Sequence, residues 1–181
     1  NAICTPSRAS ILTGQYSHLN GVPVFNQLDP KKVTVAHRLQ QAGYYTAMVG
    51  KWHLGSDPQG FDYWEILAGQ GEYFDPVLYT RDGSKKYVGE YCTDTVTDLA
   101  IAQLRARPKD KPFFMMMHHK APHRPWKPAP RHEALWRQRT IPEPATLFDS
   151  YAGRADPIRQ QKQSIARDLT RTDVKDEVPA G

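Results

Sequence analysis

Hydrophobic residues recur with two different periods along the first two thirds of the chain. Three segments have apolar positions at helical spacing, or proline and glycine placed as at helix ends, and are predicted as helices: residues 7–13, 34–42 and 93–107. Two short apolar runs are predicted as strands: residues 44–49 and 113–117. The second run is apolar on both faces, so we expect it to be buried on both sides of a sheet.

The order of these elements, helix, strand, helix, strand, predicts an α/β fold with crossover connections. Such sheets carry their chemistry at the carboxyl ends of the strands, and Lys51 and His118 lie just past the two predicted strands. Residues 57–84 are rich in Gly, Asp and Pro, which predicts loops with a hairpin among them. Further along, we expect a proline-rich loop with a short helix over 133–137, and then a helix over 156–169.

The composition narrows the class of protein. Of the 181 residues, 39% are hydrophobic, which excludes a disordered or collagen-like chain. No apolar run approaches the roughly 18–20 residues that a membrane-spanning helix needs. Two cysteines exclude a disulfide-dense scaffold and a cysteine-only zinc cluster. The net charge is +5, and residues 118–139 hold six Lys or Arg and one acid; this segment suits an acidic or sulfated ligand, with a solvated basic face as the alternative.

The segment 4–14, Cys-Thr-Pro-Ser-Arg-Ala-Ser-Ile-Leu-Thr-Gly, carries the most specific chemistry. It places the thiol of Cys4 just before the N-terminus of a predicted helix, where free backbone N–H groups and the helix dipole favour an anion. Arg8 lies one turn further along and adds a cation with a forked set of donors. A lone cysteine at such a position would ordinarily be a buried structural residue. The spacing of Pro6, Arg8 and Gly14 makes a functional site the better interpretation.

A second polar cluster ends the predicted strand 44–49, where the sequence continues Gly-Lys-Trp-His. Lys51 and His53 are two residues apart, so in extended backbone they face the same way. A lysine offers positive charge to an anion, and a histidine can move a proton near neutral pH. The pair is a candidate for a site that binds an anion and transfers a proton; a surface lysine and a structural histidine are the alternative.

These two segments resemble the first and second motifs of the sulfatase family. The first matches Cys-x-Pro-Ser-Arg-x-x-x-Leu-Thr-Gly at every constrained position, and the second follows in the family's order. The resemblance implies that Cys4 is converted to formylglycine, an aldehyde, by a formylglycine-generating or sulfatase-maturing enzyme. It also implies that Arg8 holds the modified residue, that Lys51 contacts it and the sulfate, and that His53 hydrogen-bonds the hydrated aldehyde.

A third cluster, His-His-Lys-Ala-Pro-His-Arg over residues 118–124, follows the second predicted strand. Three histidines so close together suggest zinc, but their spacing is wrong for a helical pair and the prolines exclude a helix. The family resemblance implies that His123 donates a hydrogen bond to the sulfate and to the leaving oxygen. His119, Lys120 and Arg124 are candidates for contacts with the rest of the substrate, with structural roles as the alternative.

The resemblance also implies a fold and a metal. Sulfatases are alkaline-phosphatase-like α/β sandwiches with a mixed, mostly parallel central sheet, and we expect part of that fold over residues 1–181. The family holds a divalent ion, usually calcium, with an Asp-Asp pair before the first motif and a later Asp-Asn or Asp-His pair, dipeptides that are absent from this sequence. Cys4, as formylglycine, is the one metal ligand expected in this chain. Because the first motif begins almost at Asn1, we expect an internal piece of a catalytic domain that alone binds calcium weakly and lacks activity.

The parent protein is therefore expected to be a sulfuric ester hydrolase that removes sulfate from a sulfated carbohydrate. Segments 60–65 and 69–76 resemble bacterial N-acetylglucosamine-6-sulfatase-like glycan sulfatases. Two alternatives stay open: a phosphonate or phosphate ester hydrolase of the same superfamily, and an inactive polyanion-binding fragment. The resemblance implies export to the periplasm or outside the cell. Nucleic-acid binding has only the positive charge in its favour, with no recognised motif.

Overall fold

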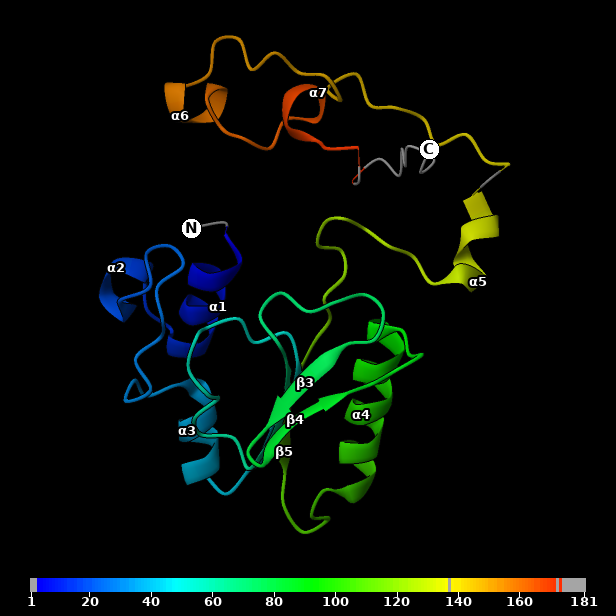
Figure 1. Ribbon diagram of the computed structural model, residues 1–181. Helices are drawn as coiled ribbons and strands as arrows, with labels where there is room; N and C mark the ends of the chain where they lie inside the picture. Colours follow the sequence, from blue (N-terminus) through cyan, green and yellow to red (C-terminus); the bar gives the residue numbers. More distant parts are fainter. Residues whose placement is uncertain (1–2, 137, 172, 174–181) are drawn as a thin grey trace. The chain divides into compact units, whose positions relative to one another are not determined.

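The computed structural model describes residues 3–136, 138–171 and 173. It divides into two compact units, Asn1–Ala121 and Pro122–Gly181. In the first unit a five-stranded sheet lies between helices (Figure 1). The elements of this unit are α1 (Cys4–Thr13), α2 (Ser17–Asn20), α3 (Val35–Gln41), β1 (Tyr45–Gly50), β2 (Tyr63–Leu67), β3 (Val77–Thr80), β4 (Gly83–Lys86), α4 (Cys92–Ala106) and β5 (Phe113–His118).

The sheet is mixed, as predicted, with the strand order β4-β3-β2-β1-β5. Strand β1 runs parallel to both of its neighbours, and its residue Val49 pairs with Glu65 of β2 and Met117 of β5. Strands β3 and β4 add an antiparallel hairpin beyond β2. The three parallel strands therefore end at the same edge, which is where the candidate site residues that follow β1 and β5 lie.

Side chains of β1 alternate between two hydrophobic clusters on opposite faces of the sheet. Met48 packs in one cluster with Ala9 and Leu12 of α1, and Val49 packs in the other with Val96 of α4. Figure 1 shows the same division, with α1 and α3 covering one face and α4 the other. The period of two along a strand thus produces the helix–sheet–helix sandwich that the sequence resemblance implied.

Most of the predicted elements of the first unit are present, with ends shifted by one to three residues. Two expectations were incomplete or wrong. The segment 57–84 contains the expected hairpin, but also β2, a strand of the parallel core. Strand β5 is at the edge of the described sheet rather than buried on both sides: Phe113 is 44% exposed and Met117 is 42% exposed.

The second unit consists of short helices and long connections. Its elements are α5 (Pro130–Glu133), the 3-10 turn η1 (Ala134–Trp136), α6 (Asp156–Arg159) and α7 (Ile165–Asp168). The continuous helix predicted over 156–169 was wrong, because this polar stretch lacks the apolar face that stabilises a helix by packing. The short helix predicted over 133–137 begins earlier, and residue 137 lies outside the described residues. No helix in the described ranges is long and apolar enough to cross a membrane.

Candidate functional site

Cys4 is the first residue of α1, and the start of that helix faces the loop that follows β1. Its Sγ lies 3.5 Å from Nδ1 of His53. The neighbouring Thr5 fixes this arrangement, because its hydroxyl lies 3.3 Å from the same Nδ1 and donates to the His53 carbonyl at 3.2 Å. His53 also has a φ of +54°, a left-handed conformation that is uncommon outside glycine and that concentrates at functional sites.

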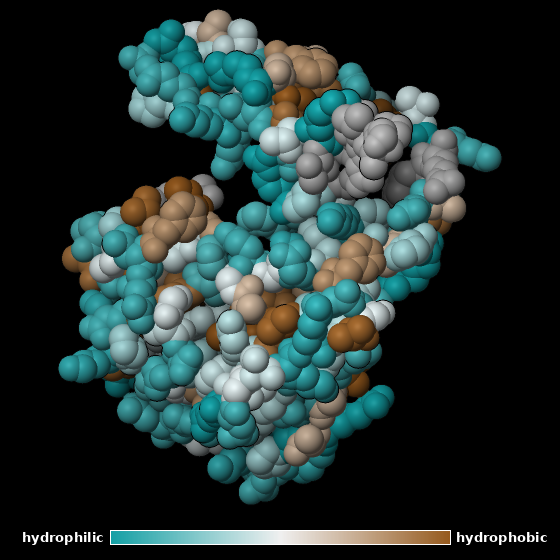
Figure 2. Space-filling model, viewed as in Figure 1, coloured by the Kyte–Doolittle hydropathy of each residue, from teal (hydrophilic) through white to brown (hydrophobic). Residues whose placement is uncertain are grey.

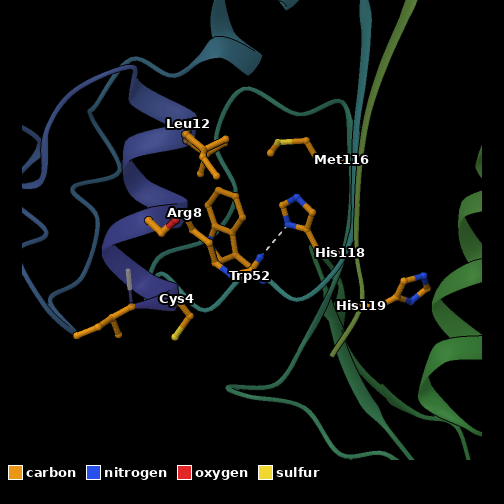
Figure 3. Close-up of a pocket in the computed structure, with 10 residues that line it drawn as sticks. Cys4, Arg8, Leu12, Trp52, Met116, His118 and His119 are labelled. Carbon is orange, nitrogen blue, oxygen red and sulfur yellow. Dashed lines mark hydrogen bonds between the residues drawn. The ribbon is translucent and has the colours of Figure 1, made fainter. Parts of the chain in front are cut away.

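Arg8 joins α1 to the ends of β1 and β5. Its Nη1 donates to the carbonyl of Lys51 at 2.6 Å and to Nδ1 of His118 at 2.9 Å, the interaction drawn as a dashed line in Figure 3. An arginine cannot accept a hydrogen bond, so Nδ1 of His118 is the acceptor and carries no proton, and the ring is neutral. Burial and the charge of Arg8 both hold the pKa of His118 below its usual value, which agrees with that assignment. Burial likewise lowers the pKa of Arg8.

Gly50 permits this junction of the two parallel strands. It pairs with His118 at the end of the sheet, and its φ is +97°. A Cβ at this position would stand 2.1 Å from the His118 carbonyl oxygen, so a side chain cannot be accommodated without moving the backbone. The Gly-Lys-Trp-His sequence therefore has a structural reason for its glycine, namely the close passage that brings Lys51 next to β5.

Lys51 is 3% exposed and its ammonium group is held by a loop that sequence reasoning did not assign to the site. Its Nζ donates to Oε1 of Gln70 at 2.5 Å. Lys120, which is also buried, donates to the backbone carbonyl of Gln70 at 3.3 Å and lies 4.9 Å above the ring of Tyr73. Gln70 therefore orients two buried lysines at once, one through its side chain and the other through its backbone.

The electrostatic environment of Cys4 is cationic. Burial lowers the pKa of Lys51, the neighbouring Cys4 opposes that shift, and the charges of Arg8 and Lys120 add to it. The charges of Arg8 and Lys120 thus disfavour the protonated form of the buried Lys51, and an anion bound beside these cations would relieve that cost. The geometry is thus suited to bind a compact anion beside the thiol.

The described residues do not fit a complete calcium site around Cys4. No group of three or more His, Cys, Asp or Glu side chains in the described part of the chain could hold a metal ion. The charged partners of Cys4 and Lys51 are cations, whereas calcium takes six to eight oxygen ligands. Cys4 could supply at most one ligand after modification, so the described residues alone would not hold the ion.

A pocket of about 320 Å³ borders Cys4, and His53 is not among its lining residues. Its lining includes Cys4, Arg8, Trp52 and His118 (Figure 3). His119 also borders it, but Figure 3 shows the His119 ring on the far side of β5, directed toward α4 and away from Cys4. Its buried Nδ1 has no hydrogen-bond partner among the described residues.

His123 and Arg124 belong to the second unit and are described within it alone. Nδ1 of His123 lies 2.7 Å from the Arg124 carbonyl oxygen. Arg124 forms an ion pair with Asp173, and its Nε donates to the same carboxylate at 3.0 Å. The side chain of Arg124 thus has a partner within its own unit, and the contacts expected of His123 and Arg124 with substrate stay predictions.

The structure brings together Cys4, Arg8, Lys51 and His53, and it adds residues that the sequence analysis missed. His118 was noted for its place after a predicted strand and in a histidine cluster, and Thr5 and Gln70 fell within segments that resemble sulfatases but were given no role of their own. The one signal for His118 in the sequence was its position at the end of a predicted strand. Gln70 gave none, because its contact with Lys51 joins residues in separate loops.

Comparison with known proteins adds independent evidence. A family model described as sulfatase matches residues 1–174. N-acetylglucosamine-6-O-sulfatase of Bacteroides thetaiotaomicron is 51% identical over 94% of this chain and 31% of that protein. N-acetylglucosamine-6-sulfatase of Homo sapiens is 30% identical over 76% of this chain and 29% of its own length. A solved structure, of a protein in complex with its substrate D-glucosamine-2-N,6-O-disulfate, is 50% identical with a TM-score of 0.89 and covers 94% of this chain and 35% of that one. The chain spans about a third of the length of these relatives.

Proposed function

Because the chain belongs to the sulfatase family, we propose that the full-length protein hydrolyses sulfate esters and that its substrates are glycans carrying O-sulfated glucosamine. The observation that carries the proposal is the gathering of Cys4 and of two further cations, Arg8 and Lys120, around Lys51. A sulfate monoester is a compact anion with several equatorial oxygens, which is the ligand that such a set of donors favours. The relatives that act on glucosamine 6-sulfates support the choice of sugar.

Residue 4 is proposed to be the nucleophile. Once Cys4 is converted to formylglycine by a maturation enzyme, the hydrated aldehyde supplies a hydroxyl that can attack sulfur and a second hydroxyl that can later release it. Arg8 holds this residue in place, because its guanidinium is anchored at the Lys51 carbonyl and at His118. A fixed guanidinium costs no reorganisation when negative charge develops beside it.

Lys51 and His53 are proposed to act on the two sides of residue 4. The buried Lys51 ammonium balances the charge on the sulfate oxygens, and its hold on Gln70 keeps it oriented. Nδ1 of His53, 3.5 Å from Sγ in the unmodified residue, is within reach of a hydroxyl on the same carbon. His53 is therefore the base that takes a proton from the hydrate when the aldehyde re-forms. From the family resemblance, His123 assists the leaving oxygen.

The test uses the full-length protein produced together with a sulfatase-maturing enzyme. Mass spectrometry and hydrazide labelling of the peptide that contains residue 4 report conversion to the aldehyde. Turnover of glucosamine 6-sulfate is then compared with turnover of glucosamine 6-phosphate. The proposal expects the sulfate to be preferred by at least about 100-fold. A preference for phosphate would favour the related phosphate ester hydrolases, and polyanion binding without turnover of the matured protein would favour a binding module.

A further inference from the structure

A second pocket lies on the His53 side of Cys4 and has a different character from the cationic site. Its volume is about 180 Å³, and we call it the Phe25 pocket; its lining residues are Thr5, Phe25, Asn26, Gln27, His53, Leu54 and Gly55. Phe25 is 66% exposed, and its ring centroid lies 6.4 Å from that of His53. An exposed aromatic ring thus stands one side chain away from the thiol, since Nδ1 of His53 lies 3.5 Å from Cys4 Sγ.

The walls of the Phe25 pocket are fixed to the core of the first unit. The Leu28 amide donates to the Leu54 carbonyl at 2.9 Å and ties the two loops that form the walls together. Both leucine side chains are buried in the same hydrophobic cluster. Gly55, with a φ of +75°, lets Gln27 lie close, because a Cβ there would stand 3.2 Å from Gln27 Cβ and Cγ. The loop after α2 therefore presents Phe25 from an anchored backbone.

We propose that the Phe25 pocket binds the sugar ring of the substrate, with Phe25 stacked on an apolar face of the pyranose and the amides of Asn26 and Gln27 facing its hydroxyl or amino groups. This inference rests on the proposed function, since it assigns the part of the substrate beyond the sulfate. A pyranose has an apolar C–H face and a polar rim, which an aromatic ring beside carboxamides complements. The pocket adjoins His53, so a sugar bound there has its sulfate within reach of residue 4.

The surroundings of the pocket provide a matched control. Figure 2 shows apolar side chains on the surface near α1 and α2, where Ile11, Tyr16 and Leu19 are each more than half exposed. Tyr16 is 76% exposed and stacks on His18 with ring centroids 6.0 Å apart, and it does not line the Phe25 pocket. Phe25→Ala and Tyr16→Ala therefore remove comparable exposed aromatic rings, one inside the proposed sugar site and one outside it.

The test measures turnover of glucosamine 6-sulfate by the matured full-length protein, together with inhibition by inorganic sulfate, which has no sugar. Phe25→Ala is expected to lower kcat/KM about tenfold while the inhibition constant for sulfate changes less than about twofold, because only the sugar contact is lost. Phe25→Tyr should retain most of the activity, and Gln27→Ala should raise KM about threefold. Tyr16→Ala should leave every constant unchanged.

Two results would overturn the inference. One is turnover by Phe25→Ala within twofold of the unchanged protein. The other is an equal loss for glucosamine 6-sulfate and for inorganic sulfate, which would mean that Phe25 supports the whole site. Saturation-transfer NMR with unsulfated glucosamine separates this inference from the proposed function. Binding of the sugar that depends on Phe25, in a matured protein without sulfatase activity, would leave the subsite standing and refute the activity.

Discussion

The two sides of Cys4 differ in burial, charge and hydrogen bonding. On the cationic side, Arg8 and Lys51 are both held by protein acceptors, and Lys51 is buried while Arg8 is half-buried. On the other side, the Phe25 pocket presents an exposed aromatic ring and exposed amide side chains on an anchored loop. Burial removes the hydration that stabilises a cation, and a bound anion compensates for that loss. An exposed ring is stabilised instead when an apolar surface covers it.

This difference matches the two parts of the proposed substrate. The sulfate group is the same in every sulfate ester, so a site for it can be rigid and built from buried, mutually fixed groups. The sugar varies between substrates, and exposed side chains on a surface loop can change without disturbing the core. Variants on the cationic side should therefore impair all sulfate esters alike, while variants of the Phe25 pocket should change the preference among sugars.

The largest effect is expected from Cys4→Ala in the full-length protein. Removing the proposed nucleophile should lower kcat by about 10⁴-fold or more for every sulfate ester, because the remaining groups can only bind and polarise the substrate. Steady-state turnover of both a glycan sulfate and an aryl sulfate checks this. The thermal midpoint should change little, since Cys4 is only half-buried and makes no core contact.

Cys92→Ala is the matched control for that variant. Burial raises the pKa of the Cys92 thiol to about 11, so it carries little thiolate at neutral pH. Its removal should reduce stability through a small core cavity but leave kcat within about twofold. If Cys92→Ala abolished turnover and Cys4→Ala did not, the assignment of residue 4 as nucleophile would be wrong.

The next largest effect is expected from Arg8→Lys. A lysine keeps the charge but cannot reach the Lys51 carbonyl and His118 with the same planar group, so residue 4 loses its fixed partner. Turnover should fall by about 10² for all sulfate esters, the usual cost of one preorganised donor. The exposed Arg38→Lys is the control and should leave the rate unchanged. A loss confined to one sugar would contradict the division between the two sides.

The fold shows why a sequence predicts some of these features and misses others. The elements with a clear helical or extended period, such as α4 and β1, were predicted close to their observed ends. Strand β2 was missed because Glu65 interrupts its apolar pattern. That carboxylate is buried and accepts hydrogen bonds from the hydroxyls of Tyr63 and Tyr87. Tyr87 follows the β3–β4 hairpin, so the pattern of residues around Glu65 cannot predict that this tyrosine is its partner.

The candidate site likewise contains residues that the sequence predicted and residues that it did not. Cys4, Arg8, Lys51 and His53 lie in two short motifs that resemble those of the sulfatase family, so the sequence could single them out before any tertiary contact was known. Gln70 could not be identified in this manner, since it reaches Lys51 only after β1 and β2 pair in parallel register. Contacts between loops at one edge of a sheet depend on tertiary structure, and the sequence of either loop does not encode the partner.

Gln70→Ala is expected to have a moderate effect that tests this contact. The variant removes the acceptor that orients the Lys51 ammonium, and turnover should fall about tenfold, as for a hydrogen bond to a charged group. Loss of the acceptor also disfavours the protonated form of Lys51, whose pKa burial already lowers. As the pH is raised, the variant should therefore lose its activity at a lower pH than the unchanged protein does, because activity needs the Lys51 ammonium. A pH–rate profile measures this shift.

Gln70→Glu sharpens that test because it should move the alkaline loss of activity to higher pH and, at the same time, weaken the binding of inorganic sulfate. A carboxylate beside Lys51 raises the pKa of the lysine, so the alkaline loss of activity should move to higher pH. The same negative charge should weaken inhibition by inorganic sulfate by about tenfold. The control is Gln59→Ala, which alters an exposed glutamine outside the site. An unchanged alkaline limb in both Gln70 variants would show that Gln70 does not orient Lys51.

The smallest effect is expected from His118→Gln and concerns stability. The pKa of His118 is lowered in the folded protein, so as pH falls below about 6.5 the unfolded chain takes up a proton that the folded chain resists. This histidine therefore makes the unfolding free energy fall with falling pH, and glutamine, which can still accept from Arg8, does not titrate. The thermal midpoint of the variant should drop less between about pH 7.5 and 5.5 than that of the unchanged protein. An equal drop in the thermal midpoint of His118→Gln and of the unchanged protein would place His118 outside the buried cationic side.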